Sequence, residues 1–265
     1  MLELKNIYKT FNPGTINEKR ALNGLNLKLN EGDFVTVIGG NGAGKSTMLN
    51  AVAGTWPVDE GQILIDNIDV TKLSEHKRAT YLGRVFQDPM TGTAATMGIE
   101  ENLALAKRRG KTRFLKPGIT KKEREEYKEL LKILGLGLED RLTSKVGLLS
   151  GGQRQALTLL MATMNPPKLL LLDEHTAALD PGTAEKVLNL TRRIVEENQL
   201  TCLMITHNMQ SAIDLGNRIL MMDSGNIVLD IGGEEKKDMT VDGLLEKFKT
   251  GVGKALDNDR ILLSE

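Results

Sequence analysis

Residues Gly39 to Thr47 read GGNGAGKST and match the pattern G-x-x-x-x-G-K-[ST] of phosphate-binding loops. The run Phe34–Ile38 before the loop is apolar and rich in β-branched residues, which is typical of a buried strand. Ser46 to Ala53 after the loop carries apolar residues at helical spacing, and Gly54 supplies a helix stop. This order of strand, loop and helix predicts a nest of backbone N–H groups that binds an anion at a helix N-terminus.

The loop residues have distinct predicted roles. Lys45 is expected to reach the β- and γ-phosphates, and the Ser46 hydroxyl is expected to bind Mg²⁺. The alternative, a glycine-rich turn that contains a lysine by chance, fits the flanking strand and helix poorly. The sequence therefore predicts a site for a nucleoside triphosphate, with contacts from Gly39, Asn41, Gly42, Ala43, Gly44, Lys45, Ser46 and Thr47.

The composition narrows the class of protein. The 265 residues include 35 basic and 35 acidic side chains, so no global field favours nucleic acid, and none is expected as a partner. The single cysteine, Cys202, lies in an apolar run and is expected as a core thiol in a reducing cytosol. No run approaches the ~18 apolar residues that a membrane span needs, and the N-terminus lacks the layout of a signal peptide. We expect a soluble cytoplasmic chain that can dock on a membrane protein.

The order of elements predicts an α/β fold with a P-loop NTPase core. Before Asp33 the apolar residues alternate, as in Leu25 to Leu29, which indicates half-buried antiparallel strands. The uninterrupted apolar run Leu169–Leu172 and the run Thr201–Thr206 are typical of central parallel strands. Two further runs, Arg218–Met222 and Ile227–Asp230, predict a closing hairpin.

A single domain over residues 1–265 is expected, with three parts. Residues 1–89 and 166–231 are predicted to form the ATP-binding core with its N-terminal antiparallel β subdomain. Residues 90–165, rich in charge, are predicted to form an inserted helical subdomain, with an amphipathic helix over Lys121–Leu134. Residues 232–265 are expected to be a short polar tail.

A second glycine motif lies at Leu149 to Gln153, which read LSGGQ. Ser150 is a good N-cap for the apolar-periodic run that follows, and the two glycines free backbone N–H groups at a helix N-terminus. On these residues alone, an anion site and a well-capped helix are equally good interpretations.

LSGGQ downstream of a phosphate-binding loop, followed by the four-leucine strand that ends in Asp173-Glu174, resembles the nucleotide-binding subunits of bacterial ABC transporters. The resemblance covers essentially the whole chain. It implies that two copies, as a homodimer or heterodimer, pack head to tail around ATP. Carried over, it implies that Ser150, Gly151, Gly152 and Gln153 contact the γ-phosphate of the ATP that the partner copy holds.

Two carboxylates follow the four-leucine strand. A carboxylate at the carboxyl end of a parallel strand faces the crevice where α/β folds bind ligands. Asp173 is expected to hold Mg²⁺, because hard cations prefer oxygen ligands, and Glu174 to act as general base toward the attacking water. The alternative is a pair of salt-bridged or helix-capping acids.

Other roles come from the resemblance alone. It implies that Gln87 contacts Mg²⁺ and the attacking water and that His207 donates to the γ-phosphate. Asp180, which is also the expected N-cap before Pro181, matches the loop that crosses the dimer interface. Phe11 aligns with the aromatic residue that stacks on adenine. Tyr8 competes for that role, and we favour Phe11.

Two segments depart from a simple interpretation. His175 stands where most relatives have proline, and the loss of a fixed φ is expected to loosen the backbone there. The basic cluster Lys107 to Arg113 predicts either a contact with lipid headgroups or an acidic partner, or a solvated loop.

The resemblance implies an ATPase subunit of a membrane transporter, peripheral at the inner face of the cell membrane through a separate integral membrane permease. The helical subdomain and the segment Asp88 to Asn102 would pass motion to that permease. The His175 variant and the tail resemble subunits that work with solute-binding lipoproteins, which favours import of a small solute such as an amino acid and an extracytoplasmic solute-binding protein as a further partner. Two alternatives remain: a soluble non-transport ATPase, for example in iron–sulfur assembly, or an exporter of lipid or lipoprotein.

Overall fold

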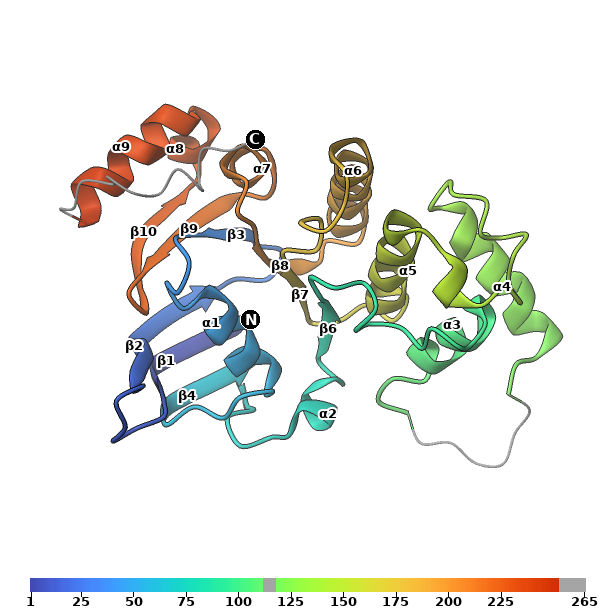
Figure 1. The fold of residues 1–265 in the computed structure, drawn as a ribbon, viewed down its shortest axis with the longest axis horizontal. Helices are drawn as coiled ribbons and strands as arrows, with labels where there is room; N and C mark the ends of the chain where they lie inside the picture. Colours follow the sequence, from blue (N-terminus) through green and yellow to red (C-terminus); the bar gives the residue numbers. More distant parts are fainter. Residues whose placement is uncertain (112–117, 253–265) are drawn as a thin grey trace.

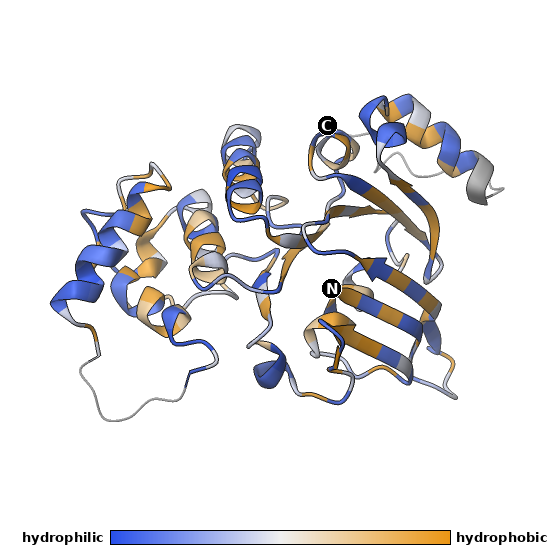
Figure 2. Cartoon of the chain, turned by 180° about the vertical axis from the view of Figure 1, so that it is seen from behind, coloured by the Kyte–Doolittle hydropathy of each residue, from blue (hydrophilic) through white to orange (hydrophobic). Residues whose placement is uncertain are grey.

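The protein is built on two β-sheets, as the computed structural model shows for residues 1–111 and 118–252 (Figure 1). The smaller sheet is antiparallel and has the strand order β2-β1-β4-β5. Its strands are β1 (Leu2–Phe11), β2 (Lys19–Leu29), β4 (Glu60–Ile65) and β5 (Ile68–Asp69). Hydrophobic and hydrophilic residues alternate along these strands (Figure 2), so one face is buried and the other is polar. The predicted N-terminal antiparallel region is confirmed.

The larger sheet has the strand order β10-β9-β3-β8-β7-β6. All its neighbouring pairs are parallel except β10 with β9, which form the predicted closing hairpin. Its strands are β3 (Phe34–Ile38), β6 (Leu82–Val85), β7 (Leu169–Asp173), β8 (Thr201–Ile205), β9 (Arg218–Asp223) and β10 (Asn226–Gly232). The predicted α/β core with a parallel sheet is therefore confirmed.

Both faces of the larger sheet are buried, which explains its uninterrupted apolar strands. In β7, Leu169 and Leu171 pack with α1 (Lys45–Ala53) and the antiparallel sheet. The alternate residues, Leu170 and Leu172, pack on the opposite face with residues of α5 (Gly151–Thr163) and α6 (Pro181–Glu197). Cys202 of β8 is fully buried on that second face, as a core thiol should be.

In its described residues, the chain between β6 and β7 carries three α-helices, which gather on one side of the molecule (Figure 1). They are α3 (Ile99–Lys107), α4 (Lys121–Lys132) and α5, with a short 3₁₀ turn at Val146–Leu148. The predicted amphipathic helix is present as α4, buries Tyr127 and Leu131, and ends two residues before the predicted Leu134. The division of the chain at residues 90, 165 and 232 stays a prediction.

Several elements carry no clear pattern in the sequence. These are β6, α2 (Glu75–Arg78), α7 (Met209–Asp214), α8 (Glu234–Lys237) and α9 (Val241–Val252). The predicted polar tail thus begins with two helices, and Leu244 and Phe248 of α9 are buried against β9 and β10. The remainder of that tail, 253–265, lies outside the described residues. Among the helices of the described ranges, none is long and apolar enough to cross a membrane.

Candidate nucleotide-binding site

The phosphate-binding loop joins β3 to α1, as its sequence predicts. Gly42 and Gly44 adopt left-handed φ angles of 81° and 102°, which favour glycine. A Cβ on Gly44 would also lie 2.6 Å from the carbonyl oxygen of Ala21 in β2, so the antiparallel sheet closes against the loop. Glycine at this position allows the backbone N–H groups to point inward in the small space between the two sheets.

The Lys45 ammonium is buried inside the loop. Its Nζ donates to the carbonyl oxygens of Gly39 at 2.7 Å and Gly40 at 3.1 Å. Burial lowers the pKa of Lys45, while the nearby carboxylates of Glu174 and Asp173 oppose that shift. The lysine therefore lies near two acidic side chains at the end of β7.

Glu174 follows β7 with an unusual backbone. Its φ of 45° is left-handed although the residue is not glycine, a conformation that costs free energy and clusters at functional sites. The backbone N–H of Glu174 donates to the carbonyl oxygen of Ile205 at 3.1 Å, which fixes it beside β8. Oε1 of Glu174 lies 2.5 Å from Nε2 of His207. Two of the three predicted catalytic side chains are thus in direct contact, and the third is Gln87.

Asp173, the last residue of β7, is held in place by Arg84. Its Oδ2 lies 3.7 Å from Nη2 of Arg84 in β6, and the same Nη2 donates to Oδ1 of Asn50 in α1 at 2.7 Å. Burial raises the pKa of Asp173, and the Arg84 guanidinium opposes this shift. The sequence offered no reason to single out Arg84, because a lone arginine in a short strand carries no pattern.

These side chains border a cavity of about 450 Å³. The cavity brings together most of the residues predicted to bind ATP within one copy, and adds Lys19 and Ala21 of β2, which sequence reasoning missed. Its lining residues are Phe11, Lys19, Ala21, Asn41, Gly42, Ala43, Gly44, Lys45, Ser46, Thr47, Gln87, Glu174 and His207. Phe11 lines the cavity and Tyr8 does not, which agrees with the preference for Phe11 as the adenine-stacking residue. Asp173 is not among the lining residues.

The signature residues lie elsewhere. Ser150 caps α5 by accepting from the backbone N–H of Gln153 at 3.3 Å, and the side chain of Gln153 accepts in turn from the Ser150 N–H. Neither residue lines the cavity at the phosphate-binding loop. Asp180 caps α6 as predicted, with Oδ1 accepting from the N–H of Thr183 at 3.0 Å.

The glycines of the signature let α5 and α6 begin side by side. A Cβ on Gly152 would lie 2.1 Å from Cγ2 of Thr183 in α6, and one on Gly151 would lie 3.3 Å from Cδ2 of Leu179. The signature and the Asp180 turn therefore form one face, with both helix N-termini at the same place. This face, the signature face, is separate from the cavity at the phosphate-binding loop.

Comparison with known proteins agrees with this geometry. The family model for ABC transporters matches residues 22–177. The chain belongs to the ABC transporter family. It is 44% identical to a tyrosine transport ATP-binding protein of Clostridioides difficile, over 95% of this chain and 100% of that protein. It is 34% identical to the phosphonates import ATP-binding protein PhnC of Treponema denticola, over 87% of this chain and 89% of that protein.

Solved structures of the family show the same fold. One is a dimeric post-hydrolysis state of an ATP-binding cassette bound to ADP and Pi, with a TM-score of 0.74 and 32% identity, covering 88% of this chain and 98% of that one. Another is the ADP conformation of an ABC transporter cassette, with a TM-score of 0.75 and 28% identity, covering 96% and 99%. The resemblance to ABC ATP-binding subunits is confirmed, and so is the fold class.

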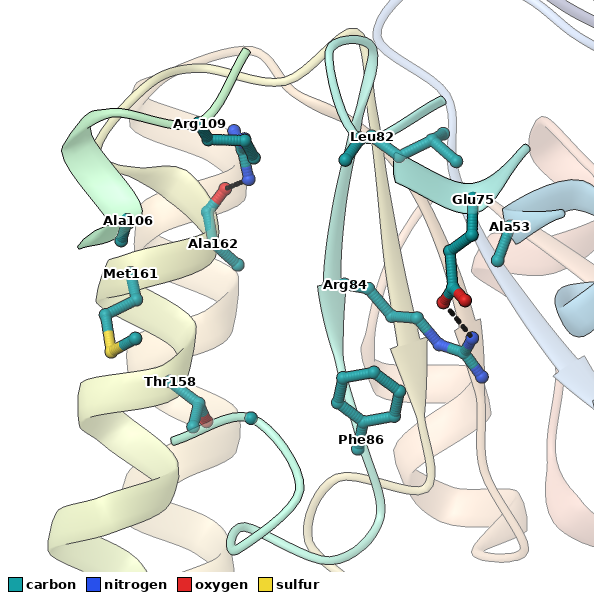
Figure 3. Close-up of a pocket in the computed structure, with 12 residues that line it drawn as sticks. Ala53, Glu75, Leu82, Arg84, Phe86, Ala106, Arg109, Thr158, Met161 and Ala162 are labelled. Atoms are coloured by element: carbon teal, nitrogen blue, oxygen red, sulfur yellow. Dashed lines mark hydrogen bonds and ion pairs between the residues drawn. The ribbon is translucent and has the colours of Figure 1, made fainter. Parts of the chain in front are cut away.

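This ABC protein has a second cavity, of about 230 Å³, between the helices and the core (Figure 3). Met161 and Thr158 of α5 lie on one side of this groove, and Arg84 and Phe86 lie on the other. The guanidinium of Arg84 sits over the Phe86 ring at 4.5 Å from its centroid. Phe86 directly precedes Gln87, so the groove and the nucleotide cavity share one short segment of chain.

The basic cluster is largely taken up by internal contacts. Lys107 lies 2.5 Å from Glu126, Arg108 pairs with Glu123 at 3.1 Å, and Arg109 donates to the carbonyl oxygen of Asn165 at 2.6 Å. These three side chains tie α3 to α4 and α5 and are not a solvated loop. The rest of the cluster that sequence analysis singled out, Thr112 and Arg113, lies outside the described residues.

Proposed function

We propose that this chain is the ATP-binding and ATP-hydrolysing subunit of a membrane ABC transporter that imports a small solute, such as an amino acid. The observation that carries the proposal is the cavity in which Lys45, Gln87, Glu174 and His207 meet. Relatives named for tyrosine transport and for phosphonate import support an importer over an exporter.

The loop and Lys45 hold the phosphates of the substrate ATP. An anion in the cavity offers the Lys45 ammonium charged acceptors in place of the carbonyl oxygens of Gly39 and Gly40, and charge-assisted hydrogen bonds are the stronger ones. Phe11 packs edge-on against Trp56, with ring centroids 5.0 Å apart, at the side of the cavity where the adenine ring would stack.

Mg²⁺ fits the donor set of this site. Ser46 and Gln87 line the cavity and offer hydroxyl and amide oxygens, and Asp173 adds a carboxylate nearby. These hard oxygen ligands, few in number, suit an ion that keeps several waters and binds mainly through phosphates. When bound, Mg²⁺ would neutralise phosphate charge.

Glu174 acts as general base. Its carboxylate takes a proton from the attacking water as the water oxygen bonds to the γ-phosphorus and the bond to ADP breaks. His207, with Nε2 2.5 Å from the Glu174 carboxylate, holds that carboxylate in place before ATP binds. Once ATP is bound, its N–H would donate to the transferred phosphoryl group instead. Gln87, which also lines the cavity, orients the same water.

Two copies complete each site. The face formed by Ser150, Gly151, Gly152, Gln153 and Asp180 lies apart from the cavity of its own chain, and a dimeric cassette bound to ADP and Pi is among the related structures. Head-to-tail packing places this face on the partner's ATP. Binding of ATP then closes the dimer, and hydrolysis reopens it, because the closed form has the higher affinity for ATP.

The groove of Figure 3 receives the permease. Most of its lining is small or apolar, as at Ala53, Ala106 and Met161, and Glu75, Arg84 and Arg109 add charge. We expect a short helix of a separate membrane protein to suit this groove. Because Phe86 lines the groove and directly precedes Gln87, a helix bound in the groove would affect the position of Gln87. The chain would thereby be cytoplasmic and peripheral at the inner face of the cell membrane, with an extracytoplasmic solute-binding protein as a further partner of the permease.

The test uses tagged Glu174→Gln chains to capture partners from detergent-solubilised native membranes with MgATP. We expect a multi-span membrane protein that Ala106→Arg in the same chain prevents from binding, because the longer side chain fills the groove. Leu105→Arg is the matched control, since Leu105 neighbours Ala106 on α3 but does not line the groove and is 55% exposed. Soluble partners alone would support a non-transport ATPase, such as one in iron–sulfur assembly, and would overturn the transporter proposal.

A further inference from the structure

The segment between β7 and α6 joins the cavity at the phosphate-binding loop to the signature face. Glu174 stands at its start, and Asp180, the N-cap of α6, stands at its end. Two short backbone bonds shape the turn, from the N–H of Ala177 to the carbonyl oxygen of Glu174 at 2.9 Å and from that of Leu179 to Thr176 at 3.1 Å. A contact that holds this turn against the rest of the protein therefore also holds Glu174 in its orientation.

His175 provides such a fixed point. Its side chain is 1% exposed, and its Nε2 lies 2.9 Å from Oγ1 of Thr191, which is also fully buried, in the middle of α6. A side-chain hydrogen bond to the long helix α6 thus ties the segment where proline would have restricted φ, and the loosened backbone expected at this position stays a prediction.

The direction of this hydrogen bond follows from Thr191. A hydroxyl has a single hydrogen, and that of Thr191 is directed at the carbonyl oxygen of Val187, 2.9 Å away. Thr191 must therefore accept from His175, so that Nε2 carries the proton of the ring. Nδ1 is the bare nitrogen, and it is buried with no hydrogen-bond partner among the described residues. Burial lowers the pKa of His175 to about 4, so the ring is neutral.

The geometry points to His175 as a positioning residue for Glu174, acting through its single hydrogen bond to Thr191 on α6. The inference rests on the proposed role of Glu174 as base. Without the acceptor, the His175 N–H would be buried and unsatisfied, which favours a shift of the segment toward water. Glu174 is the adjacent residue, holds a left-handed φ of 45°, and must keep its carboxylate 2.5 Å from His207. A misplacement of about 1 Å at a reacting group costs up to 10²-fold in rate.

Thr191→Val tests the inference, because valine has nearly the shape of threonine and lacks the acceptor. We expect kcat for ATP hydrolysis by the full chain to fall about tenfold or more, with the affinity for a fluorescent ATP analogue unchanged. Thr191→Ser keeps the hydroxyl and is expected to retain kcat. At the donor end of the bond, His175→Leu should lower kcat as Thr191→Val does. His175→Gln should keep most of the wild-type kcat, because its amide offers an N–H at similar reach.

A double variant separates positioning from general loss of stability. In the Glu174→Gln background, Thr191→Val should lower the residual single-turnover rate by less than twofold, because the group that it positions is already gone. Far-ultraviolet circular dichroism and thermal unfolding check that each chain is folded. The inference is overturned if folded Thr191→Val keeps its kcat, if Thr191→Ser is equally impaired, or if the effects of Thr191→Val and Glu174→Gln multiply. By contrast, full turnover in Glu174→Gln alone would remove the proposed base and leave the hydrogen bond as a structural contact.

Discussion

The phosphate-binding loop and the signature face both place glycines at a helix N-terminus, yet they differ in what surrounds them. The loop lies between two sheets and is bordered by Lys45, Glu174 and His207, so its cavity holds charged groups that face one another. The signature face has the capped ends of α5 and α6, and its residues do not line that cavity. We propose that one region binds an anion within the chain and that the other completes a site on a second chain.

The largest expected effect comes from a substitution in the phosphate-binding loop alone. Lys45→Ala removes an ammonium that would make two charge-assisted hydrogen bonds to phosphates, and we expect ATP affinity to fall by about a hundredfold or more. Ser150→Arg should leave ATP affinity of the isolated chain within about twofold and abolish hydrolysis, because a long side chain blocks the face that meets the partner.

Mixing the two variants sharpens this comparison. A dimer of one Lys45→Ala chain and one Ser150→Arg chain contains one site with an intact loop and an intact signature. Titration of one chain into the other should restore activity, with a maximum near equal amounts, while each alone stays inactive. If no ratio restores hydrolysis, the signature does not act on the partner's nucleotide.

The adenine end of the cavity offers the next effect in size. Phe11→Ala removes the ring that packs against Trp56, and stacking of a base on an aromatic ring contributes about 1–3 kcal/mol. We expect ATP affinity to fall about tenfold, with little change for inorganic triphosphate, which has no base. Tyr8→Ala is the matched change on the same strand, and isothermal titration of both variants decides between them. An equal loss in Tyr8→Ala alone would assign the stacking role to Tyr8.

Prediction from sequence worked where local pattern and burial coincide. The loop, β7 and β8 were predicted because apolar runs between turn residues match strands that are buried on both faces. By contrast β6 was missed, because Gly83 and Arg84 interrupt its apolar run. Both interruptions have structural causes: a Cβ on Gly83 would lie 2.6 Å from the carbonyl oxygen of Ala162 in α5, and Arg84 reaches Asp173.

The missed parts of the site share a different cause. Lys19 reaches the cavity because β2 pairs with β1 in one particular register, and His175 meets Thr191 across 16 residues of chain. Neither contact leaves a local pattern, since each depends on how distant elements pack. The family resemblance supplied residues that recur in many relatives, but it could not supply a contact made by His175, which departs from them.

On the signature face, the packing of Gly152 predicts a loss of stability. Gly152→Ala would put a methyl group 2.1 Å from Cγ2 of Thr183, and overpacking of this kind costs about 1–3 kcal/mol. Thr183→Ser removes that methyl group and keeps the hydroxyl, so the double variant should recover most of the free energy of unfolding measured in urea. Gly118→Ala is the control, because no atom of the described residues lies within 4 Å of its added Cβ. A double variant no more stable than Gly152→Ala would show that the α5–α6 contact is not the source of the loss.

Asp180 gives the smallest effect and separates the two roles that its position combines. As N-cap of α6 it accepts from the Thr183 N–H at 3.0 Å, and Asp180→Ala should lower the free energy of unfolding by about 1 kcal/mol. Asp180→Asn keeps a good capping oxygen and loses the charge, so it should unfold like the wild type. If Asp180 also acts across the dimer, Asp180→Asn should still slow hydrolysis, with ATP affinity of the isolated chain unchanged. Normal hydrolysis in Asp180→Asn would restrict this residue to capping, and the signature face would then meet the partner through α5 alone.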